Sequence, residues 1–179
     1  TGATGLIGSA LAEAYARPGI ELILHGRNEG QLAELGTRCR ARGAGVRTRA
    51  LDLRDRGALK VWLAELCTQV PIDLAIVNAG VSTNVDPDGS GERWEAVEEL
   101  LEVNVMAAIA TVDALLPAMR ARRRGQIALI SSLAAWYGLP ITPGYCASKA
   151  ALKVYGEALR GWLAPQGVQV NVVLPGFVR

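Results

Sequence analysis

The sequence predicts an α/β fold in which helices cover a doubly wound parallel sheet. The chain has 179 residues, of which 50% are hydrophobic, and its net charge is only +2. This composition fits one globular domain with a sizeable core. Short apolar runs of strand length alternate with stretches of helical periodicity, and nearly continuous apolar strands are typical of a parallel sheet covered on both faces. Right-handed crossovers then give the doubly wound order. We expect a single domain over residues 1–179.

The N-terminal third is expected to alternate between helices and strands. Apolar residues at helical spacing predict a helix over residues 5–17, which Pro18-Gly19 ends. A short apolar strand follows at residues 20–24. Asn28 is placed to cap a helix that runs to about residue 42.

The middle of the chain continues this alternation. We expect a strand over residues 46–53, a helix over 56–68 that Asp55 caps, and a buried strand over 72–77. A long helix is predicted over residues 92–122, with a kink at Pro117.

The remaining elements complete the pattern. We expect a strand at residues 126–130, a helix from near Tyr145 to about residue 163, and a last strand at 168–174. The basic run at residues 120–125 is interpreted as a helix C-terminus, with Gly125 just past its end, in preference to a phosphate or partner site.

The distinctive motifs all follow predicted strands. In open α/β sheets, ligands bind outside the carboxyl ends of the strands, so these positions predict a single site at that edge. The positions are Gly2 to Gly8, Gly26-Arg27, Asp52, Asn78 to Gly80, Ser132 and Pro175-Gly176.

A glycine-rich segment opens the first predicted helix. Gly2, Gly5 and Gly8 allow a tight turn and a close approach of the backbone to a pyrophosphate, which a helix N-terminus attracts. The alternative is that the glycines serve only the packing of the helix on the sheet.

No acidic residue of the kind that usually holds the ribose hydroxyls of NAD follows the predicted strand at residues 20–24, where the sequence is His25-Gly26-Arg27. Arg27 is available there for a 2′-phosphate, so we favour NADP(H) over NAD(H). The alternative is that Arg27 is a solvated loop residue. Asp52, at the end of the predicted strand at residues 46–53, either accepts a hydrogen bond from an adenine amino group or only caps the next segment.

Tyr145 and Lys149 lie four residues apart, and Ser132 precedes them in the chain. On a helix the two side chains project from the same face, and an ammonium close to a phenol favours the phenolate. Such a phenol can exchange a proton with an alkoxide, while Ser132 Oγ holds the substrate oxygen. The pair alone is a weak motif. Trp136 and Tyr137 are expected to line a substrate pocket.

Asn104 lies within an apolar helical stretch, where asparagine is a poor helix former and needs partners. It is either a polar relay beneath Lys149 or a satisfied core asparagine.

Several classes of function are disfavoured. The charge balance gives no electrostatic case for nucleic acid or a membrane surface, and no apolar run is long enough to span a bilayer. Cys39, Cys67 and Cys146 are far apart in the sequence, and His25 is the only histidine. We therefore expect neither a disulfide framework nor a metal site. The same cysteine pattern favours a cytoplasmic location.

Both ends of the chain are unusual. Thr1 to Gly5 reads as a loop that should follow a strand, and the chain stops directly after another loop. We expect a fragment of a longer domain.

Together these motifs resemble those of the short-chain dehydrogenase/reductase family, over essentially all 179 residues. The matching positions appear in the family's order: Thr1-Gly2 to Gly8, Asp52, Asn78-Ala79-Gly80, Asn104, Ser132, Tyr145-x-x-x-Lys149 and Asn171 to Pro175-Gly176. The resemblance implies a Rossmann-like sheet, here without its first, central strand and its C-terminal substrate segment.

The resemblance also implies roles for four residues. Tyr145 would be the general acid or base, Ser132 would orient the carbonyl, Lys149 would assist Tyr145 and bind the nicotinamide ribose, and Asn104 would hold a water. The substrate would be a small-molecule carbonyl or alcohol.

The NADP(H) contacts and the assembly are implied in the same way. A homodimer or homotetramer would form through the helices at residues 92–122 and 145–163. The implied contacts are Gly2, Thr4, Gly5, Leu6, Ile7, Arg27, Asp52, Leu53, Asn78, Ala79, Gly80, Tyr145, Lys149, Pro175, Gly176 and Val178.

One departure keeps other readings open. The glycine spacing is more similar to the family's extended branch, whereas Asn78 to Gly80 and the surroundings of Tyr145 are similar to the shorter branch, which we favour. The alternatives are an extended-branch epimerase or dehydratase acting on nucleotide sugars, and a non-catalytic, cofactor-sensing relative.

Overall fold

Two parallel sheets with their helices make up the computed structural model, which describes residues 1–178. Contacts divide the chain into two compact units, the first Thr1–Asp55 and the second beginning at Arg56. Both units have the Rossmann-like α/β character that the sequence predicts. A single-domain organisation over residues 1–179 stays a prediction.

The first unit pairs two strands and covers them with two helices. Its elements are α1 (Leu6–Tyr15), β1 (Glu21–Gly26), α2 (Glu29–Ala41) and β2 (Gly45–Ala50). β1 and β2 run parallel, and their core contains Leu24, Leu32 and Leu35. The predicted cap is confirmed, because Asn28 Oδ1 accepts a hydrogen bond of 2.9 Å from the Gln31 N–H.

The second unit contains a three-stranded parallel sheet in the order β3-β4-β5. Its elements are α3 (Arg56–Gln69), β3 (Leu74–Val77), α4 (Trp94–Leu101), η1 (Glu102–Met106), α5 (Ala107–Arg122), β4 (Gly125–Ile130), η2 (Leu133–Ala135), α6 (Pro143–Leu163), η3 (Ala164–Gln166) and β5 (Val168–Val173).

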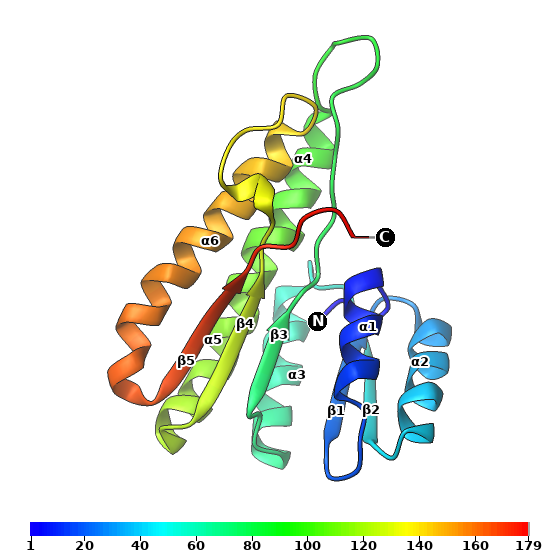
Figure 1. Ribbon diagram of the computed structural model, residues 1–179, viewed down its shortest axis with the longest axis vertical. Coiled ribbons are helices and arrows are strands. Elements are labelled where there is room, and N and C mark those ends of the chain that lie inside the picture. Colours follow the sequence, from blue (N-terminus) through cyan, green and yellow to red (C-terminus); the bar gives the residue numbers. More distant parts are fainter. Residues whose placement is uncertain (179) are drawn as a thin grey trace. The chain divides into compact units, whose positions relative to one another are not determined.

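Helices pack along this sheet so that its central strand is the most deeply buried. α6 lies along β5, and α5 packs against α3 (Figure 1). Ile127 and Leu129 of β4 are fully buried. The expectation of strands covered on both faces is wrong for β5 within residues 1–178. Val168 and Val170 are buried there, but the alternating Gln169 is exposed, so the helices cover one face of this strand.

The long predicted helix is present, but it departs from α-helical geometry at an unexpected place. α4 and α5 are joined by the π-helical turn η1, where the Ala107 N–H donates to the carbonyl of Glu102. α5 continues through Pro117 to Arg122. The irregularity that the structure shows is therefore centred on Asn104, and π turns of this kind are frequent at functional sites.

The same helix corrects one prediction from the sequence. Among residues 1–178, Trp94–Arg122 is long and apolar enough to cross a bilayer by length and composition alone. However, 56% of its most apolar window is buried inside the protein. Packing in the core therefore accounts for its apolar character.

The end of α5 is also built differently from the prediction. Arg123, not Gly125, adopts the left-handed conformation at the helix end, with φ of 49°. Gly125 instead begins β4, where a methyl group would lie 2.6 Å from the Sδ of Met119. Gly125 is therefore needed for close packing, while the backbone N–H groups of Arg123 and Arg124 cap α5.

α6 approaches the sheet most closely at Gly156. A methyl group there would lie 2.4 Å from Val172 Cγ2 and 2.8 Å from Leu129 Cδ1. Gly161 lies on the same helix, and a methyl group there would meet no atom within 4 Å. Alanine substitutions at the two glycines therefore distinguish the effect of packing from the effect of helix propensity.

We predict that Gly156→Ala destabilises the protein by about 1–3 kcal/mol through overpacking, although alanine favours helices. Gly161→Ala is the control, and it should be neutral or stabilising by up to about 1 kcal/mol, because only propensity changes. Urea unfolding of the intact protein measures both values. Equal effects of the two substitutions would contradict this account of the helix–sheet contact.

Candidate active site

The carboxyl ends of the three strands of the second unit bring the predicted post-strand residues together. β3 leads into Asn78 to Gly80, and β4 leads into Ser131 and Ser132. The Ser131 N–H donates to the carbonyl of Val173 over 2.8 Å, and the next loop is joined to Pro175 by a 3.0 Å bond from the Leu133 N–H. Three of the predicted positions thus share one edge of the sheet.

Tyr145 and Lys149 lie on the face of α6 that is turned toward this edge. Pro143 occupies the first turn of α6, where its missing N–H costs nothing. One helical turn separates the two side chains, and Lys149 Nζ lies 5.6 Å from the centre of the Tyr145 ring. The predicted pairing of ammonium and phenol is therefore present in the geometry.

The ammonium of Lys149 is buried, with only 4% of the residue exposed. Nζ donates a 3.0 Å hydrogen bond to the carbonyl of Ile130 at the end of β4. Burial lowers the pKa of Lys149 to about 8, because desolvation disfavours the charged form. A lysine with this pKa is still mostly protonated at pH 7, so it presents a positive charge beside Tyr145.

Asn104 is fully buried in the π turn and all of its side-chain groups are bonded. Oδ1 accepts from the Val81 N–H over 2.8 Å, and Nδ2 donates to the Val81 carbonyl over 2.9 Å. Nδ2 also donates to Ser148 Oγ over 3.0 Å. These bonds match the reading of a satisfied core asparagine, and they fix the loop after β3 to α6.

Gly80 explains how that loop passes so close to the helix. A methyl group there would lie 3.1 Å from Lys149 Nζ and 3.2 Å from Asn104 Oδ1. Both polar atoms therefore face the same spot beneath the Gly80 backbone, and any side chain at this position would press on them.

Ser132 begins the short 3-10 turn η2, and its Oγ accepts a 3.1 Å hydrogen bond from the Ala134 N–H. Because a hydroxyl can accept and donate at once, its hydrogen can still be donated to a substrate oxygen.

The sequence did not single out two further serines. Ser148 Oγ donates to the Tyr145 carbonyl over 2.8 Å and so links Asn104 to the turn that carries Tyr145. Ser131 Oγ donates to the carbonyl of Lys149 over 2.7 Å. The signal for Ser148 was its small polar side chain in an otherwise apolar part of the helix.

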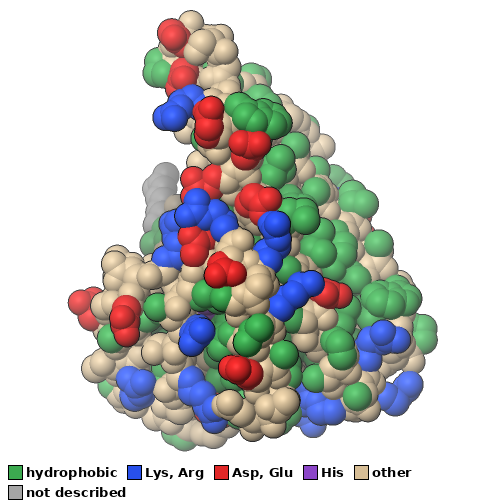
Figure 2. All heavy atoms as spheres, turned by 180° about the vertical axis from the view of Figure 1, so that it is seen from behind, with side chains coloured by type: hydrophobic (Ala, Val, Ile, Leu, Met, Phe, Trp, Pro, Cys, Tyr) green, Lys and Arg blue, Asp and Glu red, His purple; other side chains and the backbone are tan. Residues whose placement is uncertain are grey.

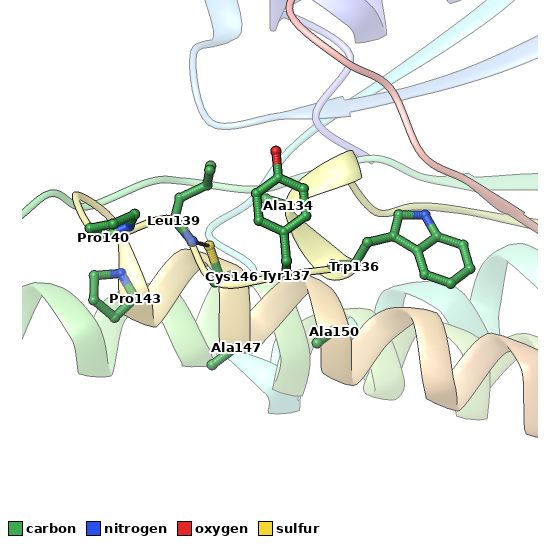
Figure 3. A pocket seen from close by; sticks show the side chains of 11 residues that line it. Ala134, Trp136, Tyr137, Leu139, Pro140, Pro143, Cys146, Ala147 and Ala150 are labelled. Carbon is green, nitrogen blue, oxygen red and sulfur yellow. Dashed lines mark hydrogen bonds between the residues drawn. The ribbon is translucent and has the colours of Figure 1, made fainter.

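Trp136 and Tyr137 line a pocket of about 470 Å³, but Tyr145 and Ser132 do not line it, and its use by a substrate stays a prediction (Figure 3). The helix α6 contributes Cys146, Ala147 and Ala150 to the pocket. These positions project from a different side of the helix than Tyr145 and Lys149. The pocket is therefore separate from the proton-transfer groups.

In the first unit, the glycine loop presents the N-terminus of α1. Gly2 has a positive φ of 65°, and the Ala3 N–H donates to the carbonyl of His25 over 2.7 Å, which fixes the loop to β1. Gly5 occupies the cap position and gives no side-chain hydrogen bond to α1. The first N–H groups of the helix are therefore suited to an anion.

The other predicted residues of this unit differ in their surroundings. Arg27 is exposed just after β1. Asp52 accepts hydrogen bonds from the backbone and guanidinium of Arg54, which hold the pKa of its carboxyl below the usual range, and Arg27 contributes to this. The turn-capping role of Asp52 is thus present. Leu53 is buried, whereas Leu6 is largely exposed.

Three other predicted contacts lie in loops after strands. Asn78 and Ala79 are half-buried after β3, and Val178 is 50% exposed after β5. Their assignment to a cofactor stays a prediction.

Chemically, the described residues offer two capabilities. The first unit offers a glycine-lined helix N-terminus and an exposed arginine, which suit phosphate groups. The second unit offers a phenol beside a buried ammonium and a serine hydroxyl, which suit proton transfer to a carbonyl oxygen.

Comparisons with known proteins agree with this chemistry. The family model described as short chain dehydrogenase matches residues 1–179. An uncharacterized oxidoreductase from Myxococcus xanthus is 36% identical over 180 residues, which cover 100% of this chain and 70% of that protein.

Two solved structures share the fold with different cofactors. A short-chain dehydrogenase from Sphingobium yanoikuyae in complex with NADPH matches with a TM-score of 0.90 and 29% identity, over 99% of this chain and 69% of that chain. An NAD+-bound xylitol dehydrogenase matches with a TM-score of 0.91 and 26% identity, over 98% of this chain and 68% of that chain. With the family model covering residues 1–179, this chain belongs to the short-chain dehydrogenase family of oxidoreductases.

Proposed function

We propose that this chain is the dinucleotide-binding and catalytic part of an NADP(H)-dependent carbonyl reductase or alcohol dehydrogenase. The observation that carries the proposal is the buried Lys149 ammonium one helical turn from Tyr145, at the sheet edge that also holds Ser132. When bound, the cofactor would supply or accept the hydride. The residues of the chain supply the proton and the orientation.

In the direction of reduction, Tyr145 donates the proton to the oxygen that becomes the alcohol. Ser132 donates a hydrogen bond to the same oxygen and holds it beside the phenol. Lys149 stabilises the negative charge that Tyr145 acquires, because its charge lies close in a water-poor site. In the direction of oxidation the same groups act in reverse, with Tyr145 as the base.

The residues fit a dinucleotide phosphate. The α1 N-terminus lacks a side-chain cap, and Gly2 and Gly5 leave its approach open, so Gly2, Thr4, Gly5, Leu6 and Ile7 are proposed to hold the pyrophosphate.

The remaining cofactor contacts are assigned by the same reasoning. Arg27 is proposed to bind the 2′-phosphate, and Asp52 and Leu53 to border the adenine. Asn78, Ala79, Gly80, Pro175, Gly176 and Val178, with Tyr145 and Lys149, are proposed to contact the nicotinamide end.

NADP(H) rather than NAD(H) is proposed from Arg27 alone. Among residues 1–178 this guanidinium forms no ion pair with a carboxylate, while the neighbouring Asp52 is bonded to Arg54. A forked cation that is exposed and not held in an ion pair suits a phosphate. The NADPH-bound and NAD-bound relatives do not decide the question by themselves.

A homodimer or homotetramer in the cytoplasm is proposed as the working state. Large hydrophobic side chains are exposed on the helices of the second unit, including Met106, Val154 and Trp162. Figure 2 shows hydrophobic side chains along the side of the molecule seen at its right-hand edge. An exposed apolar face of this kind is typical of a subunit contact.

We predict that Tyr145→Phe lowers kcat for carbonyl reduction by about 10²- to 10⁴-fold, because the variant lacks the proton donor. The dissociation constant for NADPH should stay within about threefold of the wild-type value, because the ring remains. Turnover of a panel of aldehydes and ketones, with NADPH titrated by fluorescence, measures both. Tyr155→Phe, further along α6 and outside both the pocket lining and the proton-transfer groups, is the matched control. Retained turnover in Tyr145→Phe would rule out its role.

We predict that Arg27→Ala raises the dissociation constant for NADPH by about 10- to 100-fold, because a charge-assisted phosphate contact is lost. Binding of NADH should change by less than about threefold, because NADH has no 2′-phosphate. Parallel titrations of both cofactors provide the measurement, with the exposed Arg17→Ala as control. Equal weakening of both cofactors would refute the 2′-phosphate assignment.

A further inference from the structure

Three hydrogen bonds join the segment after β3 to the start of α6. Thr142 Oγ1 donates to the carbonyl of Thr83 over 2.6 Å, and the Val85 N–H donates to the carbonyl of Ile141 over 2.9 Å. The third bond runs from the Gly144 N–H to Glu92 Oε2 over 2.7 Å. They end one residue before Tyr145.

The bond to Glu92 takes the place of a missing local cap. Thr142 occupies the cap position of α6 but makes no side-chain cap, and its hydroxyl donates to the carbonyl of Thr83 instead. The Gly144 N–H would then lack a partner inside the helix. Glu92, 52 residues away in the chain, supplies the acceptor, and its negative charge is favourable at a helix N-terminus.

The fit between Glu92 and this helix end is close. A methyl group on Gly144 would lie 3.1 Å from Glu92 Oε2 and 3.4 Å from Oε1, so an alanine at that position would press on the carboxylate. Glu92 Oε1 is buried and has no hydrogen-bond partner among residues 1–178. The carboxylate is therefore committed to the first turn of α6.

We propose that Glu92 is a positioning residue for Tyr145, an inference that rests on the proposed function. Lys149 lies a full turn into α6 and is held by Ile130, whereas Tyr145 lies in the first turn, where helices fray. By holding Gly144, Glu92 fixes the backbone that carries the phenol relative to Ser132. Displacement of a reacting group by about 1 Å can cost about 10²-fold in rate.

Glu92→Ala tests this role, with Glu92→Gln as the conservative variant and Glu98→Ala, exposed on α4, as control. Glu92→Ala should lower kcat by about 10- to 100-fold, while the dissociation constant for NADPH changes by less than about threefold. Glu92→Gln keeps an acceptor of the same shape and should recover most of kcat. Gly144→Ala should also lower kcat, because it disturbs the same contact at the helix backbone. Combined with Glu92→Ala, it should cause little further loss, since both remove one interaction.

Amide hydrogen exchange gives a readout that does not need turnover. In Glu92→Ala, exchange should rise in residues 142–148 and stay unchanged in residues 152–163 of the same helix. Unchanged exchange in residues 142–148, equal kcat losses in Glu92→Ala and Glu98→Ala, or no recovery in Glu92→Gln would overturn the proposal. If the wild-type protein reduces no carbonyl, the proposed function fails, and exchange alone decides whether Glu92 holds the turn of Tyr145.

Discussion

Burial of the Lys149 ammonium is the constraint on which the second unit depends. A charge taken out of water is costly unless it is bonded, and its one described hydrogen bond goes to the carbonyl of Ile130. Ser131 Oγ donates to the carbonyl of the same lysine, and a methyl group on Gly80 would lie 3.1 Å from its Nζ. The end of β4, the loop after β3 and the first turns of α6 are thus all arranged around one cation.

Much of the fold follows from local chemistry and was predictable for that reason. Asn28 caps α2 because its side chain competes well for a free N–H, and Pro143 starts α6 because a helix start needs no donor there. The clustering of Ser132 with Pro175 follows from topology, since parallel strands end at the same edge. The pairing of Tyr145 with Lys149 follows from the helical period alone.

The features that the sequence did not predict depend on contacts between distant segments. The left-handed residue at the end of α5 was expected to be Gly125, because glycine favours that conformation, but it is Arg123. Gly125 is instead glycine because Met119 leaves no room there for a side chain. The π turn centres on Asn104, whose side chain forms hydrogen bonds with both the N–H and the carbonyl of Val81. The exposure of Gln169 likewise depends on which faces the helices cover. Periodicity carries no information about such partners.

The close packing of α6 against the sheet at Gly156 has a consequence for how this helix can move. The side chains of Val172 and Leu129 pack directly against the backbone of α6 at Gly156. If the helix slid by one turn, the side chain of Leu152 or Arg160 would have to enter this space, which is too small for a side chain. Sliding of α6 along the sheet is therefore opposed by close packing, and we expect slow rearrangements of the second unit to leave the register of α6 on the sheet unchanged.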